Sequence, residues 1–408
     1  MVAVIGLPLV AVLIAILWIS VLDRTNGRIL SAGGAREYLL HVPDSYDPAV
    51  PAPLVISLHA GSTWPAQQKN LTGWNRKADA NGFIVVYPSG TPQVFNVVRT
   101  WYTFESGTGL ERDVEFIAEL IDTLRSAYNI DPARIYADGM SNGGGMAFVL
   151  SCTLSDRIAA VGMVAPAQSL PLDWCTPDRP VPTIVFHGTA DPMVPYAGGR
   201  FGDPFNPVKP VFPAIRDFVA SRAERNRCVG GPSESPVAPG ITRREHMGCA
   251  EDASVVLYTV SGGGHTWPGG KPLPEWRVGP NTDSIDATSE MWSFFREHPA
   301  RGLKSRRPDR GLLPAALQGR VESGGQSGLA ADQLRPGQLL PRPLSLGDEL
   351  HPRRGIGEDI GLAVDVQLAL ERSIQFRYHG DSRPGEYRKM RMIRSSEQTI
   401  RIHEEEKP

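Results

Sequence analysis

Cysteine is scarce in this sequence, with four residues in a chain of 408. They are Cys152, Cys175, Cys228 and Cys249, and none forms a Cys-x-x-Cys pair, which argues against a zinc site or a thioredoxin-like redox pair. The short separations suit two disulfides, 152–175 and 228–249, each stabilising by about 3 kcal/mol in the chain-entropy model. Four reduced, buried thiols are the alternative, and the spacing alone leaves both open.

A surplus of charge of either sign is also missing. The formal net charge is −2 and no basic stripe alternates with aromatic residues, so we expect no nucleic-acid partner. Hydrophobic residues make up 41% and charged residues 21% of the chain, which is typical of soluble globular proteins. The length suits one large domain with an appendage.

The last part of the chain, residues 299–408, lacks both cysteine and tryptophan. Its aromatic residues are Phe376, Tyr378 and Tyr387, and it is rich in arginine, glycine and proline. A segment of this composition cannot bury much apolar surface. We expect a low-order tail that is dispensable for activity and that follows a catalytic domain over residues 27–298.

One uncharged run, Val2–Leu22, is long enough to cross a bilayer as a helix. No basic residue precedes it and no clear small-x-small site follows, which favours an uncleaved anchor over a cleaved signal peptide. Arg24 and Arg28 follow the run, and the positive-inside tendency would hold the domain inside unless a basic segment is missing from the start. We expect export to an extracellular or periplasmic location, with residues 1–26 as signal peptide or anchor and as the sole membrane contact.

Short apolar runs alternate with helical patterns between residues 27 and 298. The runs are bounded by glycine and proline, as expected for strands buried on both faces of a parallel sheet. Apolar residues at three- and four-residue spacing predict helices, the first of them capped by Asp113. The alternation predicts an α/β fold with a mostly parallel central sheet and helices on both faces. The predicted strands are Leu54–Leu58, Phe83–Tyr87, Ile135–Ala137, Thr183–His187 and Ser254–Val260, and the predicted helices are Asp113–Tyr128, Ala214–Asn226 and Ser284–His298.

A G-x-S-x-G pattern occurs at Gly139-Met140-Ser141-Asn142-Gly143. It follows the predicted strand Arg134–Ala137 and precedes a helical pattern, which is the context of a sharp strand-to-helix turn carrying a nucleophilic serine. A chain with 42 glycines can contain the pattern by chance, so the strand before it and the helical pattern after it are needed to assign it a catalytic role. We predict that Ser141 is a catalytic nucleophile.

A serine hydroxyl is a weak nucleophile and needs a base that is itself held by an acid. In this architecture the chain order is serine, acid, histidine, with the acid and the histidine in loops after later strands. Asp191 follows the strand that ends at His187, and His265 lies in a glycine-rich loop after the strand that ends at Val260. We predict Asp191 as the acid and His265 as the base.

Three other residues compete for these roles. His187 is the rival base, but it ends a strand before the acid, where a structural role fits better. Asp138 and Asp113 are the rival acids, but one lies in the approach to the serine turn and the other begins a helix.

An acyl-transfer reaction also needs two N–H donors for the oxyanion. One should be the backbone of Asn142, directly after the nucleophile, and the other should come from the loop after an early strand, here residues 58–62. A tight turn without a catalytic role is the alternative for that loop.

The segments LVISLHAGS, VVYPSG, GMSNGGGMA, FHGTADPMVPY and LYTVSGGGHTWPGG together resemble the polyhydroxybutyrate depolymerase-like esterases, a group akin to feruloyl and acetylxylan esterases. The resemblance runs from Arg36 to Phe295. It implies an α/β-hydrolase fold, the triad Ser141, Asp191 and His265, secretion, and neither a metal nor an organic cofactor. It also favours the two disulfides, because the cysteines near 228 and 249 look like paired positions of the family.

One position departs from the family pattern. The family has glycine directly after the histidine of its oxyanion loop, whereas this chain has Ala60. Gly61 is therefore the expected second donor.

Three tryptophans, Trp64, Trp101 and Trp267, fall in loops expected near the catalytic face. They could form an aromatic platform for a feruloyl group, a sugar or a polyester chain, with Trp267 the preferred candidate because it lies two residues after His265. Packing of the loops against the domain is the alternative for each ring.

The leading function is a serine esterase that acts on hydroxyalkanoate polyester or oligomer. The alternatives are a feruloyl or acetylxylan esterase on plant polysaccharide, a serine peptidase with the same triad, and a surface protein that keeps the fold without catalysis. The expected partner is an ester substrate, polymeric or oligomeric.

Overall fold

The computed structural model describes residues 25–93, 98–203, 209–300, 391–393 and 401–403. The chain divides into two compact units, Met1–Ala363 and Val364–Pro408.

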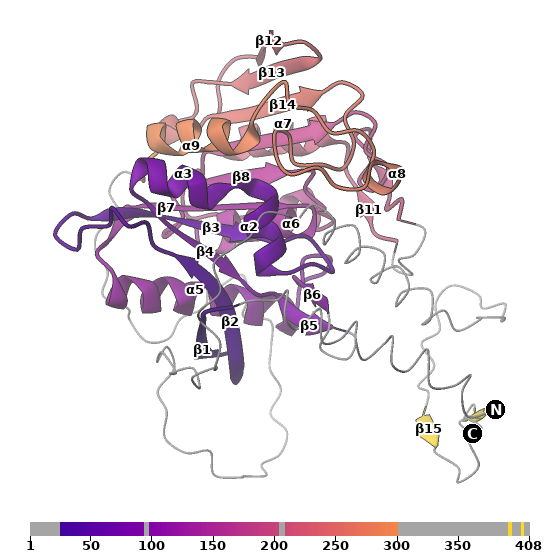
Figure 1. Cartoon of the computed structure of the whole chain (residues 1–408). Helices are drawn as coiled ribbons and strands as arrows, with labels where there is room; N and C mark the ends of the chain where they lie inside the picture. Colours follow the sequence, from indigo (N-terminus) through magenta and orange to yellow (C-terminus); the bar gives the residue numbers. More distant parts are fainter. Residues whose placement is uncertain (1–24, 94–97, 204–208, 301–390, 394–400, 404–408) are drawn as a thin grey trace, which may run out of the picture. The chain divides into compact units, whose positions relative to one another are not determined.

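A ten-stranded sheet forms the centre of the first unit, in the order β1-β2-β4-β3-β7-β8-β9-β14-β13-β12 (Figure 1). The run from β4 to β14 is parallel, and antiparallel strands extend it at both edges. Two short antiparallel pairs, β5 with β6 and β10 with β11, lie outside this sheet. The strands are β1 Gly27–Ser31, β2 Gly34–His41, β3 Ala52–Leu58, β4 Ile84–Pro88, β5 Thr91–Gln93, β6 Val98–Thr100, β7 Ile130–Met140, β8 Ala160–Val164, β9 Thr183–Gly188, β10 Gly199–Arg200, β11 Val211–Phe212, β12 Ser233–Ala238, β13 Ile241–His246 and β14 Val255–Val260.

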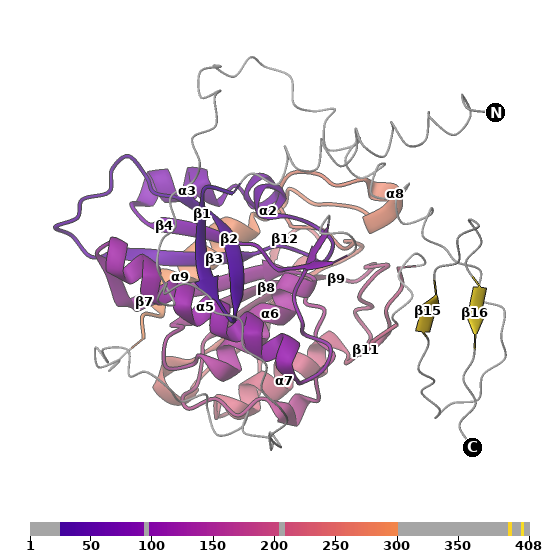
Figure 2. The same ribbon diagram turned by 90° about the horizontal axis from the view of Figure 1, so that it is seen from below.

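Helices cover both faces of the sheet, since α5, α6 and α7 pack on one face and α3 and α9 on the other (Figure 2). Side chains that alternate along a strand point to opposite faces. Leu54 and Ile56 of β3 accordingly pack with the first group of helices, and Val55 packs with the second. The helices are α2 Pro65–Thr72, α3 Trp74–Asn81, α5 Thr108–Ala127, α6 Asn142–Thr153, α7 Ile215–Arg225, α8 Glu275–Val278 and α9 Ala287–Glu297, with short 3-10 turns at Leu172–Trp174 and Ala250–Asp252.

This arrangement is the α/β-hydrolase fold, and it confirms the predicted fold class. All five predicted strands exist, and every residue of β3 is buried, as its continuous apolar run indicates. Strand β8 was not predicted, because the small residues of Ala160–Val164 give a weak strand signal.

The expected cap of α5 is wrong. The helix begins at Thr108 with Gly107 before it, so that Asp113 lies inside the helix rather than at its start. Asp113 is fully buried and pairs with Arg36 over 2.9 Å. The sequence therefore did not predict the helical turn before Asp113.

Two disulfides confirm the predicted pairing, Cys152 with Cys175 and Cys228 with Cys249. The first joins the end of α6 to the loop before β9. Across the part of the chain that the structure describes, no helix is both long and apolar enough to span a membrane. The predicted signal or anchor, residues 1–26, lies almost entirely outside the described residues.

The second unit is described only at β15 Arg391–Ile393 and β16 Arg401–His403, which pair antiparallel. The expected low-order tail therefore lies almost wholly outside the described residues and stays a prediction. In the first unit the description reaches Ala300, whose backbone N–H donates to the Ala133 carbonyl at the beginning of the long strand β7.

Candidate active site

Ser141 occupies a sharp turn between β7 and α6. Its backbone has φ 53° and ψ −119°, a conformation that is costly for a residue with a side chain and that is typical of functional turns. Three backbone hydrogen bonds fix it: its N–H donates to Val164, and its carbonyl accepts from Gly145 and Ala167. The turn thus holds the hydroxyl-bearing residue at the carboxyl end of the central sheet.

Two glycines of the motif are required by close contacts. A Cβ at Gly139 would overlap the backbone of Gly143, and a Cβ at Gly143 would overlap the carbonyl oxygens of Leu58 and His59. The turn at Ser141 is therefore packed directly against the loop that follows β3.

Asp191 and His265 are in direct contact, although 74 residues separate them. His265 Nδ1 lies 2.7 Å from Asp191 Oδ2, and both side chains are buried. The other carboxylate oxygen, Oδ1, accepts from the backbone N–H groups of Met193 and Val194, each at 2.8 Å. Strands β9 and β14 are parallel neighbours, which brings the loops after their carboxyl ends together.

The pKa of the Asp191 carboxyl is lowered. Burial favours the neutral form, but the charge of His265 and the hydrogen bonds from His187 and His265 outweigh it. A carboxylate in this state keeps the adjacent imidazole in the tautomer with hydrogen on Nδ1, leaving Nε2 able to accept a proton.

The structure does not join Ser141 to this pair by a hydrogen bond. Within the described ranges, neither the Ser141 hydroxyl nor His265 Nε2 has such a bond. Catalytic hydrogen bonds are often long before substrate binds. The three residues nevertheless follow the carboxyl ends of β7, β9 and β14, which lie within four consecutive positions of the sheet.

Asn142 and Gly61, the expected oxyanion donors, lie side by side. A Cβ built at Gly61 would be 3.3 Å from the Asn142 Cβ. Asn142 is the first residue of α6, where a backbone N–H has no acceptor within the helix. The next amide of the loop, Ser62 N–H, donates a hydrogen bond to the Arg99 carbonyl at 2.8 Å and is therefore not free for an oxyanion.

The side chain of Asn142 has a role that the sequence did not reveal. Its Oδ1 accepts from Thr100 Oγ1 at 3.0 Å and from Trp101 N–H at 2.7 Å, and its Nδ2 donates to the Trp101 carbonyl and to Thr103 Oγ1, both at 2.9 Å. The residue after the nucleophile therefore fixes residues 100–103. The amide fits because it presents both an acceptor and two donors.

His59 also has a structural role in the site that the sequence did not reveal. Its Nδ1–H donates to the Ala60 carbonyl at 2.8 Å, and its Nε2 accepts from Gly90 N–H at 2.9 Å. Burial lowers the pKa of His59 to about 4, so the ring is neutral at physiological pH. It holds the loop that contains Gly61, and its position directly after β3 is the only sequence signal for that role.

The three tryptophans proposed for substrate contact are all interior. Trp64, Trp101 and Trp267 are 3%, 1% and 1% exposed. The Trp101 indole donates to the His59 carbonyl, and that of Trp267 donates to Thr288 Oγ1. These positions favour packing over a substrate platform.

Exposed aromatic rings do occur in neighbouring segments, and the sequence reasoning missed them. Tyr102 and Phe104 are 40% and 38% exposed in the segment that follows Trp101. Trp276 is 66% exposed on α8, whose Val278 carbonyl accepts from His265 N–H. Only side-chain exposure distinguishes these rings from the buried tryptophans.

The rival residues have other contacts than those predicted for the base and the acid. His187 is buried beside Asp191, with Nε2 2.9 Å from the Val194 carbonyl. Asp138 is buried in β7 and accepts from the Ser57 hydroxyl at 2.8 Å. Asp113 accepts from Arg36, Thr91 and the Tyr102 N–H. None of the three has an exposed side chain, which favours structural roles.

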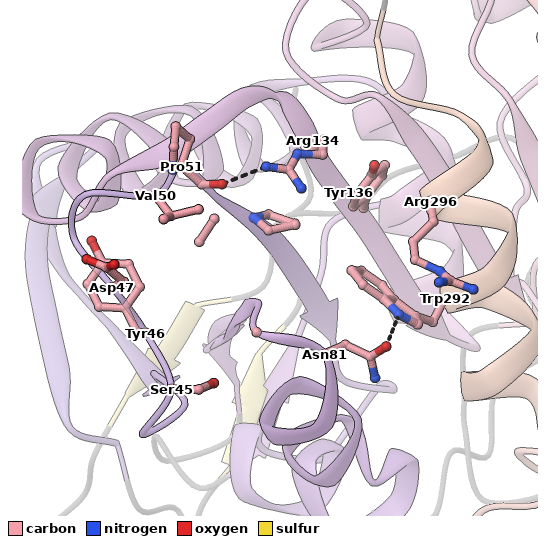
Figure 3. Close-up of a pocket in the computed structure, with 13 residues that line it drawn as sticks. Ser45, Tyr46, Asp47, Val50, Pro51, Asn81, Arg134, Tyr136, Trp292 and Arg296 are labelled. Atoms are coloured by element: carbon pink, nitrogen blue, oxygen red, sulfur yellow. Dashed lines mark hydrogen bonds between the residues drawn. The ribbon is translucent and has the colours of Figure 1, made fainter.

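A pocket also lies at the opposite ends of β3 and β7 from Ser141 (Figure 3). Its polar groups are largely used within the protein: Arg134 donates to the Pro51 carbonyl, and the Trp292 indole donates to Asn81. Ser45 lines this pocket, but no histidine does, so the pocket offers no imidazole base to activate that hydroxyl and does not compete as the catalytic centre.

The family model described as esterase PHB depolymerase matches residues 37–168, which include Ser141. The putative esterase NocK of Nocardia uniformis subsp. tsuyamanensis is 33% identical over 265 residues, covering 60% of this chain and 74% of NocK. The chain belongs to the esterase PHB depolymerase family. Membership places it among the carboxylic-ester hydrolases.

Other relatives of this esterase carry different substrate names. Feruloyl esterase B of Piromyces equi is 30% identical over 243 residues, covering 58% of this chain and 44% of that protein. Poly(3-hydroxyalkanoate) depolymerase C of Paucimonas lemoignei is 27% identical over 255 residues, covering 58% of this chain and 59% of that one. This esterase therefore spans less than two thirds of either relative, and their names leave its substrate open.

Proposed function

We propose that this esterase hydrolyses carboxylic esters through an acyl-enzyme on Ser141, with His265 as general base and Asp191 as the group that orients it. The observation that carries the proposal is the buried 2.7 Å contact between His265 and Asp191. The strained turn at Ser141 supports it, because such strain persists only where the surrounding structure enforces it.

In the first half-reaction, Ser141 Oγ attacks the ester carbonyl carbon while its proton passes to His265 Nε2. The carbonyl oxygen becomes an oxyanion, which the N–H groups of Asn142 and Gly61 stabilise. When this intermediate collapses, the carbon–oxygen bond to the leaving alcohol breaks, and His265 gives the alcohol its proton. Water then repeats the sequence, releasing the acid and restoring the Ser141 hydroxyl.

For the substrate we propose a hydroxyalkanoate ester, as polyester or oligomer. The name of the matching family model and the depolymerase among the relatives support this. A feruloyl or acetylated plant polysaccharide is the alternative, supported by the names of feruloyl esterase B of Piromyces equi and of the bifunctional acetylxylan esterase/xylanase XynS20E of Neocallimastix patriciarum. The exposed rings of Tyr102, Phe104 and Trp276 are the side chains we propose for substrate contact, in place of the buried tryptophans.

We further propose that the protein is exported and that residues 27–298 carry the activity. Two disulfides support export, because such bonds persist in oxidising compartments. Two large clusters of buried apolar side chains lie within residues 29–300, and they support the domain limit. Removing residues 301–408 should leave ester hydrolysis near the full-length rate, and a large loss would contradict the limit.

Fluorophosphonate labelling tests the chemistry, because the reagent modifies activated serines. We expect stoichiometric labelling of the wild type and none of Ser141→Ala, with hydrolysis of p-nitrophenyl butyrate lost in parallel. Equal labelling of both proteins would remove Ser141 from the mechanism. Rates on hydroxybutyrate oligomer, methyl ferulate and a peptide anilide then identify the substrate class, and cleavage of the anilide alone would overturn the esterase proposal.

A further inference from the structure

His187 lies at the end of β9, four residues before Asp191, and the catalytic steps above do not use it. Its side chain is 1% exposed, so it cannot reach a substrate. Its Nε2 lies 2.9 Å from the Val194 carbonyl oxygen and 3.4 Å from Asp191 Oδ2. The carboxylate oxygen that faces His265 therefore has a second imidazole beside it.

The surroundings of the ring fix its tautomer. Nδ1 is buried and has no hydrogen-bond partner among the described residues, whereas Nε2 faces two oxygen atoms. With the hydrogen on Nδ1, a buried donor would be unsatisfied and a lone pair on Nε2 would face the two oxygens, which is unfavourable. The hydrogen is thus on Nε2, directed at the Val194 carbonyl and the carboxylate.

The contacts of His187 and Val194 together surround the Asp191 carboxylate. Val194 donates its N–H to Oδ1, and its carbonyl accepts from His187, which in turn lies beside Oδ2. Tyr196 packs edge-on against the imidazole, with ring centroids 5.8 Å apart. Both the carboxylate and the loop that carries it are held through His187.

We propose that His187 is a positioning residue, whose Nε2–H fixes the Asp191 carboxylate in the orientation that His265 requires. This inference rests on the proposed function, because it concerns how the acid of that triad is held. Small displacements of catalytic groups have large effects, since a shift of about 1 Å can reduce the rate about 100-fold.

Two substitutions of similar size separate hydrogen bonding from packing. His187→Gln places an amide N–H as many bonds from the backbone as Nε2–H, whereas His187→Met has the same reach and no donor. We expect the methionine variant to lose about 10- to 100-fold in kcat with little change in KM. The glutamine variant should recover most of that loss.

A spectroscopic measurement provides a readout that packing alone would not change. The His265 Nδ1–H bonded to Asp191 should give a far-downfield proton resonance in the wild type and in His187→Gln. It should shift or broaden in His187→Met. If the methionine variant does not fold, His187→Asn replaces it, because its amide is too short to reach Val194.

Wild-type kcat in the variants without the donor would overturn the proposal, as would equal impairment of the glutamine and methionine variants. Failure of the proposed function is distinguishable from failure of this inference. An active Ser141→Ala enzyme would refute the triad itself, whereas an inactive Ser141→Ala beside a fully active His187→Met would refute the role of His187 alone.

Discussion

The loop after β9 and the middle of β7 each bury an aspartate, but the two carboxyl groups have opposite protonation states. Asp191 receives two backbone N–H groups and the His265 imidazole, and its pKa is lowered. Asp138 receives the Ser57 hydroxyl, its other oxygen has no partner among the described residues, and burial raises its pKa to about 8. Burial is common to both, so the charge of His265 and the hydrogen bonds that Asp191 receives from His187 and His265 decide which carboxyl is ionised.

The two groups also have opposite effects on stability. Between about pH 4 and pH 8 the native protein keeps a proton on Asp138 that the unfolded chain has lost, so rising pH lowers the free energy of unfolding through this window. Asp191 stays ionised below the pKa of the unfolded chain, so its contribution is present at neutral pH and is lost as the solution becomes strongly acidic.

The largest effect should come from Asp191→Asn. The amide can turn its N–H₂ toward His265, which favours the wrong tautomer, and we expect kcat to fall about 10,000-fold. Steady-state hydrolysis of p-nitrophenyl butyrate measures this, with thermal unfolding to show that the variant is folded. A loss smaller than tenfold would mean that Asp191 is not the orienting acid.

Asp113 extends the comparison to a buried carboxylate with a guanidinium partner. In Asp113→Asn the Arg36 guanidinium stays largely buried without its counter-ion, and we expect a loss of about 3–5 kcal/mol in the free energy of unfolding. Urea denaturation gives the value. Asp79→Asn is the matched control, because its pair with His41 is half exposed and should contribute below about 1 kcal/mol.

Asp138→Asn should have little effect on kcat, since the amide oxygen can still accept from Ser57. It should instead remove the pH dependence that the carboxyl imposes. We expect wild type and variant to diverge between about pH 4 and pH 8 in urea denaturation, with the wild type losing more stability as pH rises. Parallel curves over this range would show that Asp138 is ionised in the native protein.

The smallest effect should come from Ser57→Ala, which removes the hydroxyl that Asp138 and Gln68 share. Losing the two buried hydrogen bonds of this hydroxyl should reduce the free energy of unfolding by about 1–3 kcal/mol. Ser126→Ala, where an exposed hydroxyl bonds within its own helix, serves as the control and should change stability less. Equal changes in the two variants would mean that the Ser57–Asp138 contact contributes nothing.

The sequence predicted the features that depend on local pattern. Buried strands such as β3 and β9 were recognisable from apolar runs, and the places of Asp191 and His265 after strands anticipated the contact between their side chains. Contacts between distant residues were not recognisable in the same way. The partner of Asp113, Arg36, lies 77 residues away, so the local pattern predicts a helix cap in place of this ion pair. The four hydrogen bonds of the Asn142 side chain reach back about 40 residues. Solvent exposure also depends on these long-range contacts, and it is what favours Trp276 over Trp267 as a substrate contact.

The contact between Gly143 and the carbonyls of Leu58 and His59 limits how this enzyme can change. Any side chain at residue 143 would displace the turn at Ser141 and the loop after β3 together. A mutational library that randomises either segment alone should therefore yield few active enzymes, while paired libraries should yield more. New substrate preference is more accessible through the exposed segment around Tyr102 and Phe104, where sequence can vary without moving the reacting groups.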